Sequence, residues 1–71
     1  MVDLAAFGKR VTKERRRLGL SQRELAELAG VGRHKVIGIE NGSDRSVQTR
    51  ILDKIATALQ VRITVRFGKA A

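Results

Sequence analysis

Three basic side chains follow one another at the start of a predicted helix: Arg33, His34 and Lys35, directly after Gly32. Positive charges oppose the helix dipole there, because an N-terminus favours acidic residues, so a purely structural reason for them is weak. An arginine can donate two hydrogen bonds to O6 and N7 of guanine, and a histidine can donate to a base or a phosphate. We therefore predict that Arg33 and His34 read bases of a nucleic acid.

The elements that must position these side chains lie in residues 20–42, LSQRELAELAGVGRHKVIGIENG. Ser21 followed three residues later by Glu24 is a capping box, which begins a helix that Gly30 ends. A second helix is predicted from about residue 32 to residue 40, with Val36 and Ile39 facing inward. Two short helices joined by a glycine turn suggest a helix-turn-helix.

This stretch resembles the Cro/repressor (Xre-type) DNA-binding domain, over roughly residues 7–59. The Ser-Gln helix start, the Leu-Ala pair, the Ala-Gly-Val turn and the Glu-Asn-Gly ending carry the resemblance. It implies a mostly α fold, a four-helix lambda-repressor-like domain in which the positions of Arg33 and His34 read bases. It also implies that Gln22 contacts the DNA backbone. A departure is Gly38, where the family often has a longer polar side chain.

Further contacts with DNA are predicted around the second helix. Ile37 should face outward, where it can touch a thymine methyl group, although an exposed isoleucine can also have no role. Ser21 and Gln22 stand at a helix N-terminus, which favours an anion, and Lys35 and Arg45 flank the recognition helix. We predict that these four residues bind phosphates. Weaker candidates, for which a solvated charged surface is the alternative, are Lys9, Arg16, Arg17 and Arg23.

Two charged residues stand where the core should be. Arg15 interrupts the apolar stripe of a first helix that Asp3 caps and that runs to about Leu18. Glu40 follows Val36 by four residues and should face inward with it. An unpaired buried charge is costly, so a structural ion pair between Arg15 and Glu40 is the economical interpretation, and the family resemblance implies the same. The alternative, that both side chains reach solvent separately, stays open.

The chain after residue 42 changes its pattern. Ser46 is predicted to cap a fourth helix that ends at about Leu59. Residues 61–67 then alternate apolar and polar side chains, which predicts a β-strand. A lone strand leaves its backbone groups unpaired, so we predict pairing across a homodimer, similar to HipB-type antitoxins. A frayed basic tail is the alternative. The predicted dimer contacts are Val61, Ile63, Val65 and Phe67.

Composition limits the remaining possibilities. The 71 residues fit a single domain, and a net charge of +8 favours a polyanionic partner, although a merely basic surface is the alternative. One histidine and no cysteine argue against a metal site, and no cofactor or small-molecule ligand is expected. No apolar run approaches the ~20 residues of a membrane span, and no signal peptide is recognisable, so we expect a cytoplasmic, nucleoid-associated protein.

These observations predict a dimeric regulator that binds double-stranded DNA sequence-specifically, acting as a repressor at a palindromic operator. The alternative is an antitoxin that binds a partner toxin and represses its own promoter. RNA binding is disfavoured because Phe7 and Phe67 are the only aromatic residues. An enzyme is rejected because no nucleophile–base set, paired acid or phosphate loop is found.

Overall fold

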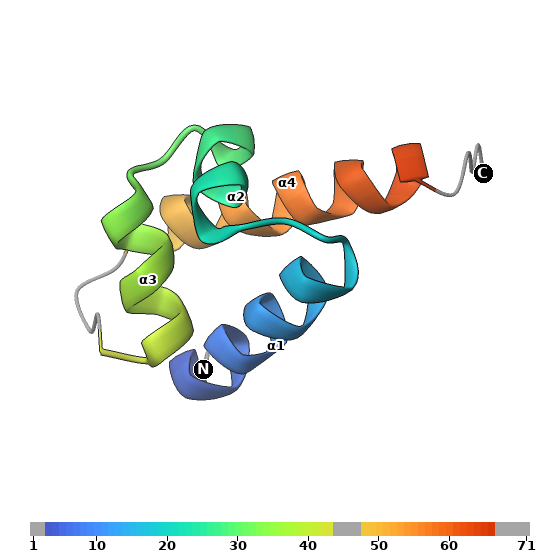
Figure 1. The fold of residues 1–71 in the computed structure, drawn as a ribbon. Coiled ribbons are helices and arrows are strands. Elements are labelled where there is room, and N and C mark those ends of the chain that lie inside the picture. The colour runs from blue at the N-terminus through green and yellow to red at the C-terminus, as the bar shows by residue number, and fades with distance from the viewer. Residues whose placement is uncertain (1–2, 44–47, 67–71) are drawn as a thin grey trace.

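The computed structural model describes residues 3–43 and 48–66, with side chains up to Gln60. Its elements are α1 (Leu4–Arg17), α2 (Gln22–Ala29), α3 (Arg33–Asn41) and α4 (Thr49–Arg66). Helix α1 packs against α3 and α4, and α2 packs against the same two helices. Figure 1 shows α4 crossing behind α2, with its C-terminal half extending past the other three helices. All the elements of the described residues are therefore helices, as the prediction of a mostly α, four-helix domain requires.

The ends of the first two helices agree with the capping pattern of the sequence. The Asp3 carboxylate accepts a hydrogen bond from the Ala6 amide at 3.1 Å. The capping box is complete, because the Glu24 amide donates to Ser21 Oγ at 3.0 Å and the Ser21 amide donates to Glu24 Oε1 at 2.8 Å. Gly30 ends α2 with a φ of 71°, a conformation that a side chain would disfavour. These local signals fix where α1 and α2 begin and where α2 turns toward α3.

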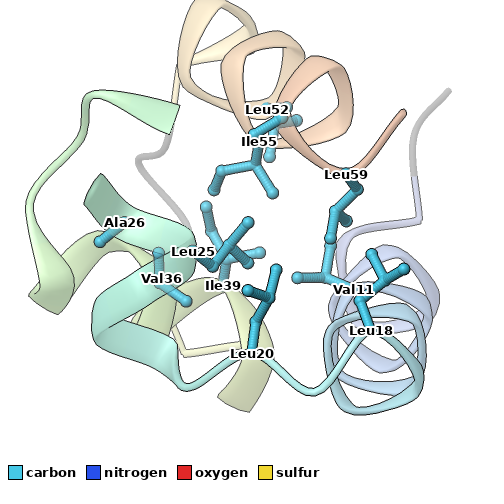
Figure 2. Packing of buried hydrophobic residues seen from close by; sticks show 11 residues of the cluster. Val11, Leu18, Leu20, Leu25, Ala26, Val36, Ile39, Leu52, Ile55 and Leu59 are labelled. Carbon is cyan, nitrogen blue, oxygen red and sulfur yellow. The ribbon is translucent and has the colours of Figure 1, made fainter. Parts of the chain in front are cut away.

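The core lies where the four helices meet, and each helix contributes to it (Figure 2). Val36 and Ile39 of α3 are buried, as predicted, and Leu25 of α2 is fully buried. Leu52, Ile55 and Leu59 of α4 are buried as well. The buried apolar residues are Val11, Leu18, Leu20, Leu25, Ala26, Val36, Ile39, Leu52, Ile55, Ala58 and Leu59. This core thus fixes the two short helices, α2 and α3, against the longer helices α1 and α4.

The C-terminal segment differs from the prediction. Helix α4 continues to Arg66 instead of ending near Leu59, so residues 61–66 are helical and the predicted strand is not present in them. A helix satisfies its backbone groups within the segment, whereas a strand in a single chain has no partner for them. Ser46, the predicted cap of the fourth helix, lies outside the described residues. So does Phe67, the last residue of the predicted strand.

One residue that the sequence pattern did not single out controls the contact between α1 and α3. Gly8 is buried in α1, and a Cβ atom added there would press into the carbonyl oxygen of Ile39. The same atom would lie 3.1 Å from the Ile39 carbonyl carbon and 3.3 Å from Glu40 Cα. These neighbours are backbone atoms, which cannot rotate away. Helix α1 therefore rests on the backbone of the last turns of α3.

We expect Gly8→Ala to lower the free energy of unfolding by about 1–3 kcal/mol, the usual range for overpacking a filled site. Urea denaturation of the two proteins measures the difference. The sign is informative, because replacing glycine by alanine at an open helical site stabilises by about 0.5–1 kcal/mol.

Ala6, which is exposed on the same helix, provides the matched control. Ala6→Gly should cost only the ordinary helix penalty of about 0.5–1 kcal/mol. A Gly8→Ala protein as stable as the unmodified chain would show that α1 and α3 can separate at no cost.

Candidate nucleic-acid interface

The N-terminus of α3 presents cations to solvent. Gly32 is the N-cap and supplies no side-chain cap, and the first turn of α3 contains no acidic residue. Arg33 and His34 are exposed, and Lys35 is half-buried. The His34 ring lies beside Gly32, since a Cβ atom added there would lie 2.5 Å from the ring carbon Cε1. The uncapped amides and the exposed cations therefore share one end of α3, a surface suited to a negatively charged or hydrogen-bond-accepting ligand.

The next outward position is less open than predicted. Ile37 and Gly38 are half-buried, while their neighbours Val36 and Ile39 face the core. Part of the Ile37 side chain is therefore available for an apolar contact, and Gly38 offers backbone only.

The start of α2 lies against the end of α3. Gln22 is half-buried, and its Nε2 atom donates a hydrogen bond to Glu40 Oε1 at 3.1 Å. Ser21 is exposed, and its hydroxyl oxygen is occupied by the capping bond from Glu24. The bond between Gln22 and Glu40 was not foreseen, because Gln22 was assigned to the DNA backbone and, unlike Arg15, does not interrupt an apolar stripe. Arg45, another predicted phosphate ligand, lies outside the described residues.

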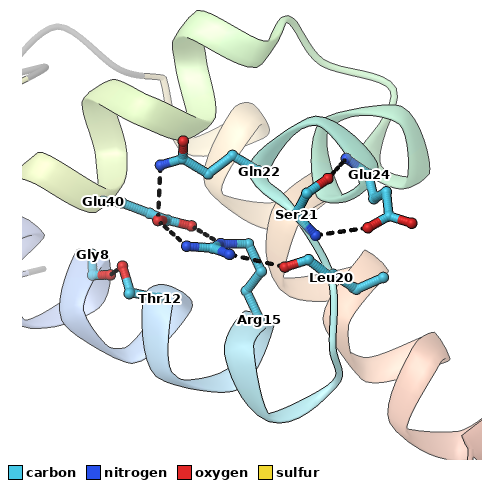
Figure 3. A network of polar contacts seen from close by, with 8 residues as sticks. All are labelled: Gly8, Thr12, Arg15, Leu20, Ser21, Gln22, Glu24 and Glu40. Carbon is cyan, nitrogen blue, oxygen red and sulfur yellow. Dashed lines mark hydrogen bonds and ion pairs between the residues drawn. The ribbon is translucent and has the colours of Figure 1, made fainter.

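The predicted pair of Arg15 and Glu40 is present and holds several elements together (Figure 3). Arg15 Nε donates to Glu40 Oε2 at 2.7 Å, and Nη2 donates to Oε1 at 3.0 Å. Arg15 Nη1 also donates to the carbonyl oxygen of Leu20, between α1 and α2, at 2.8 Å. The two side chains are 10% and 4% exposed, so the alternative of separate solvent-exposed charges is wrong.

Both members of this pair are held in their charged forms. Burial raises the pKa of Glu40, but the hydrogen bonds from Arg15 and Gln22 and the charge of Arg15 outweigh it, so the pKa lies below its ordinary value. The hydrogen bond to Glu40 raises the pKa of Arg15, against the effect of burial. The pair therefore supplies a fixed, bidentate connection from α1 to α3.

The described residues contain neither a metal site nor a membrane-spanning helix. Within residues 3–43 and 48–66, no three histidine or acidic side chains gather where they can hold a metal ion. In those ranges no helix combines the length and apolar character that crossing a membrane requires.

Comparison with known proteins gives one match. A sequence model of the helix-turn-helix family HTH_3 matches residues 11–65, which is most of the chain. No curated protein and no solved structure matches.

We expect Glu40→Gln to lower the free energy of unfolding at neutral pH by about 3–5 kcal/mol, because it leaves a buried guanidinium without its counter-charge. The pH dependence should change as well. The pKa of Glu40 is lowered on folding, so the unfolded chain binds more protons in acid. That stability is present above the ordinary carboxylate pKa and is lost as the pH falls through the lowered folded value. Urea denaturation at several pH values should show this loss in the unmodified protein and not in the variant.

Glu27 on α2 is the control, because it is exposed. Glu27→Gln should change the stability by less than about 0.5 kcal/mol and leave its acid dependence intact. Equal effects of the two substitutions would contradict a special role for the buried pair.

Proposed function

Because the chain belongs to the HTH_3 family of Xre/Cro-type helix-turn-helix proteins, a family of DNA-binding transcription regulators, we propose that it binds double-stranded DNA sequence-specifically as a dimeric repressor. The observation that carries this proposal is the exposed pair Arg33 and His34 at the uncapped N-terminus of α3. In a helix-turn-helix the second helix enters the major groove with its N-terminal residues at the base edges. Arg33 reads guanine in this arrangement, and His34 donates to a base or a phosphate.

Ile37 supplies the apolar contact with a base in the proposed complex. Its half-buried side chain follows Arg33 by one helical turn and contacts a thymine methyl group in the proposed complex. Gly38 has no side chain to contribute, so base contacts are concentrated in the first half of α3.

The proposed phosphate ligands are Ser21, Gln22, Lys35 and Arg45. The Ser21 oxygen accepts the capping bond, which leaves its hydroxyl proton for a phosphate. The Gln22 amide group has two hydrogens, of which one serves Glu40 and the second can be donated to DNA. The capping bond at Ser21 and the bond from Gln22 to Glu40 are therefore compatible with phosphate binding by both residues. The assignments of Lys35 and Arg45 rest on their positions in the sequence, Lys35 in the first turn of α3 and Arg45 four residues after its last residue.

Dimerisation supplies the contacts that one short recognition helix lacks. Two copies related by a twofold axis place their α3 helices about 34 Å apart, one turn of DNA, and so select a palindromic operator. The C-terminal half of α4 extends past the other helices, where a second copy can reach it (Figure 1). We assign the dimer contact to residues 61–67, which include Val61, Ile63, Val65 and Phe67.

The antitoxin alternative has less support. It depended on a C-terminal strand, and residues 61–66 are helical. No feature of the described residues favours a toxin as partner over DNA alone, so the regulator is the function that we propose.

We expect Arg33→Ala to weaken binding to the preferred duplex by about 1–3 kcal/mol and to random duplexes much less, because a lost guanine contact removes discrimination. The preferred duplex is obtained by sequencing what the unmodified protein retains from a random pool. Fluorescence anisotropy then gives both affinities.

Arg10→Ala is the control for this measurement, since Arg10 pairs with Glu14 on α1 at 3.6 Å, away from α3. It should preserve the ratio of the two affinities. If Arg33→Ala lowers both affinities equally, Arg33 is a phosphate ligand and not a reader of bases.

A chain ending at Gln60 should sediment as a monomer, whereas the full chain sediments as a dimer. The truncation keeps the residues of α4 that are buried in the described core, Leu52, Ile55, Ala58 and Leu59, so the helical domain should remain folded. A chain ending at Gly68 is the control and should remain dimeric. A dimeric chain ending at Gln60 would move the interface to another surface.

A further inference from the structure

The cations of α1 are divided between two sides of the helix. Arg10 and Arg17 each lie 3.6 Å from Glu14, which partly neutralises them. These three residues line a groove next to α4, together with Phe7, Val11, Ala56, Leu59 and Gln60. Lys9 and Arg16 line a different cleft, toward α2 and α3. Neither has an ion pair within the part of the chain that the structure describes.

The cleft on the second side has a volume of about 480 Å³ and an excess of positive charge. The residues that line it are Lys9, Thr12, Arg15, Arg16, Gln22, Glu40 and Asn41. The only carboxylate among these lining residues is Glu40, and both its oxygens accept hydrogen bonds from Arg15 while one also accepts from Gln22. Lys9 and Arg16 are exposed, and no carboxylate of the described residues forms an ion pair with them. The amides of Gln22 and Asn41 add neutral donors, so the cleft suits an anion.

The cleft lies at the opposite end of α3 from the base-reading residues. Asn41 is the last residue of α3 and Arg33 is the first, so their Cα atoms are separated by roughly 12 Å at 1.5 Å per residue. The major groove is about 12 Å wide. An α3 that crosses the groove with its N-terminus at the base edges therefore has its C-terminus at the wall of the groove, where the phosphates lie.

We propose that Lys9 and Arg16 form a phosphate-binding site on α1, which holds the DNA strand at the C-terminal end of α3. This site rests on the proposed function, since its ligand is the DNA backbone. Arg16 can hold a phosphate with two parallel hydrogen bonds, and Lys9 adds a point charge beside it. The site sets the position of the protein on the duplex without reading sequence.

The test compares two double variants with the same change of charge. Lys9→Gln with Arg16→Gln removes the cleft cations, and Arg10→Gln with Arg17→Gln removes those beside Glu14. Arg17, a weaker phosphate candidate of the sequence, belongs with the controls because it lies beside Glu14 and lines the groove toward α4. Affinity is measured by fluorescence anisotropy at several KCl concentrations, with the preferred duplex and with a random duplex. The magnitude of the negative slope of log K against log[KCl] should fall by roughly 1.8 for the cleft variant, which is about 0.9 for each phosphate contact that is lost. The fall should be the same on both duplexes and much smaller for the control variant.

A second arm identifies the phosphates as those of the bound duplex. Single backbone phosphates of the preferred duplex are replaced by neutral methylphosphonate, one position at a time. At the contacted positions the replacement should weaken binding of the unmodified protein and have little further effect on the cleft variant. Equal effects on both proteins at every position would overturn the site.

The remaining outcomes separate the two proposals. If both double variants lower the salt slope equally, only overall charge matters and the α1 site is wrong, while DNA binding stands. The same conclusion follows if the cleft variant keeps the slope of the unmodified protein. If the unmodified protein binds neither duplex, the proposed function itself fails, and the site fails with it.

Discussion

The buried ion pair between Arg15 and Glu40 is the constraint on which the arrangement of the helices depends. Its guanidinium belongs to α1, its carboxylate belongs to α3, and the remaining donors and acceptors come from Leu20 and from Gln22 at the start of α2. Each charge would be costly at its buried position without the other. The pair therefore admits only arrangements in which the last turn of α3, α1 and the start of α2 converge.

A second, purely steric condition allows this pair to form. Bidentate contact requires α1 to approach the last turn of α3. Gly8 allows this approach, because the Ile39 carbonyl occupies the place of its side chain. The polar network and the close backbone contact thus hold the same end of α3. The opposite end, with Arg33 and His34, is left exposed and is oriented by a helix whose position is already determined.

The features that could be predicted from sequence were those with a local or periodic signal. The spacing of Ser21 and Glu24 predicts the start of a helix. The ion pair of Arg15 could be predicted because Arg15 interrupts an apolar stripe. Gly8 gave no such signal, since a glycine within a helix looks only like a small cost until the neighbouring backbone is known. The alternation in residues 61–67 indicated a strand, but periodicity does not record whether a partner strand exists, and residues 61–66 are helical in the single chain. The base- and phosphate-binding assignments depend on DNA. The structure gives the positions of these residues except Arg45, and their contacts with DNA are proposals.

The same ion pair also shapes the electrostatics of the surface that faces the proposed DNA. A free carboxylate at the end of α3 would repel phosphates and would neutralise the cations of the cleft. Because Glu40 is bonded to Arg15 and Gln22, its charge is balanced within the protein, and Lys9 and Arg16 remain uncompensated beside it. On the other side of α1, Glu14 lies close to Arg10 and Arg17 and reduces their field. Glu40 is neutralised by Arg15, and Glu14 neutralises the cations on the side of α4. The uncompensated positive charge of α1 therefore lies on the side where α3 ends.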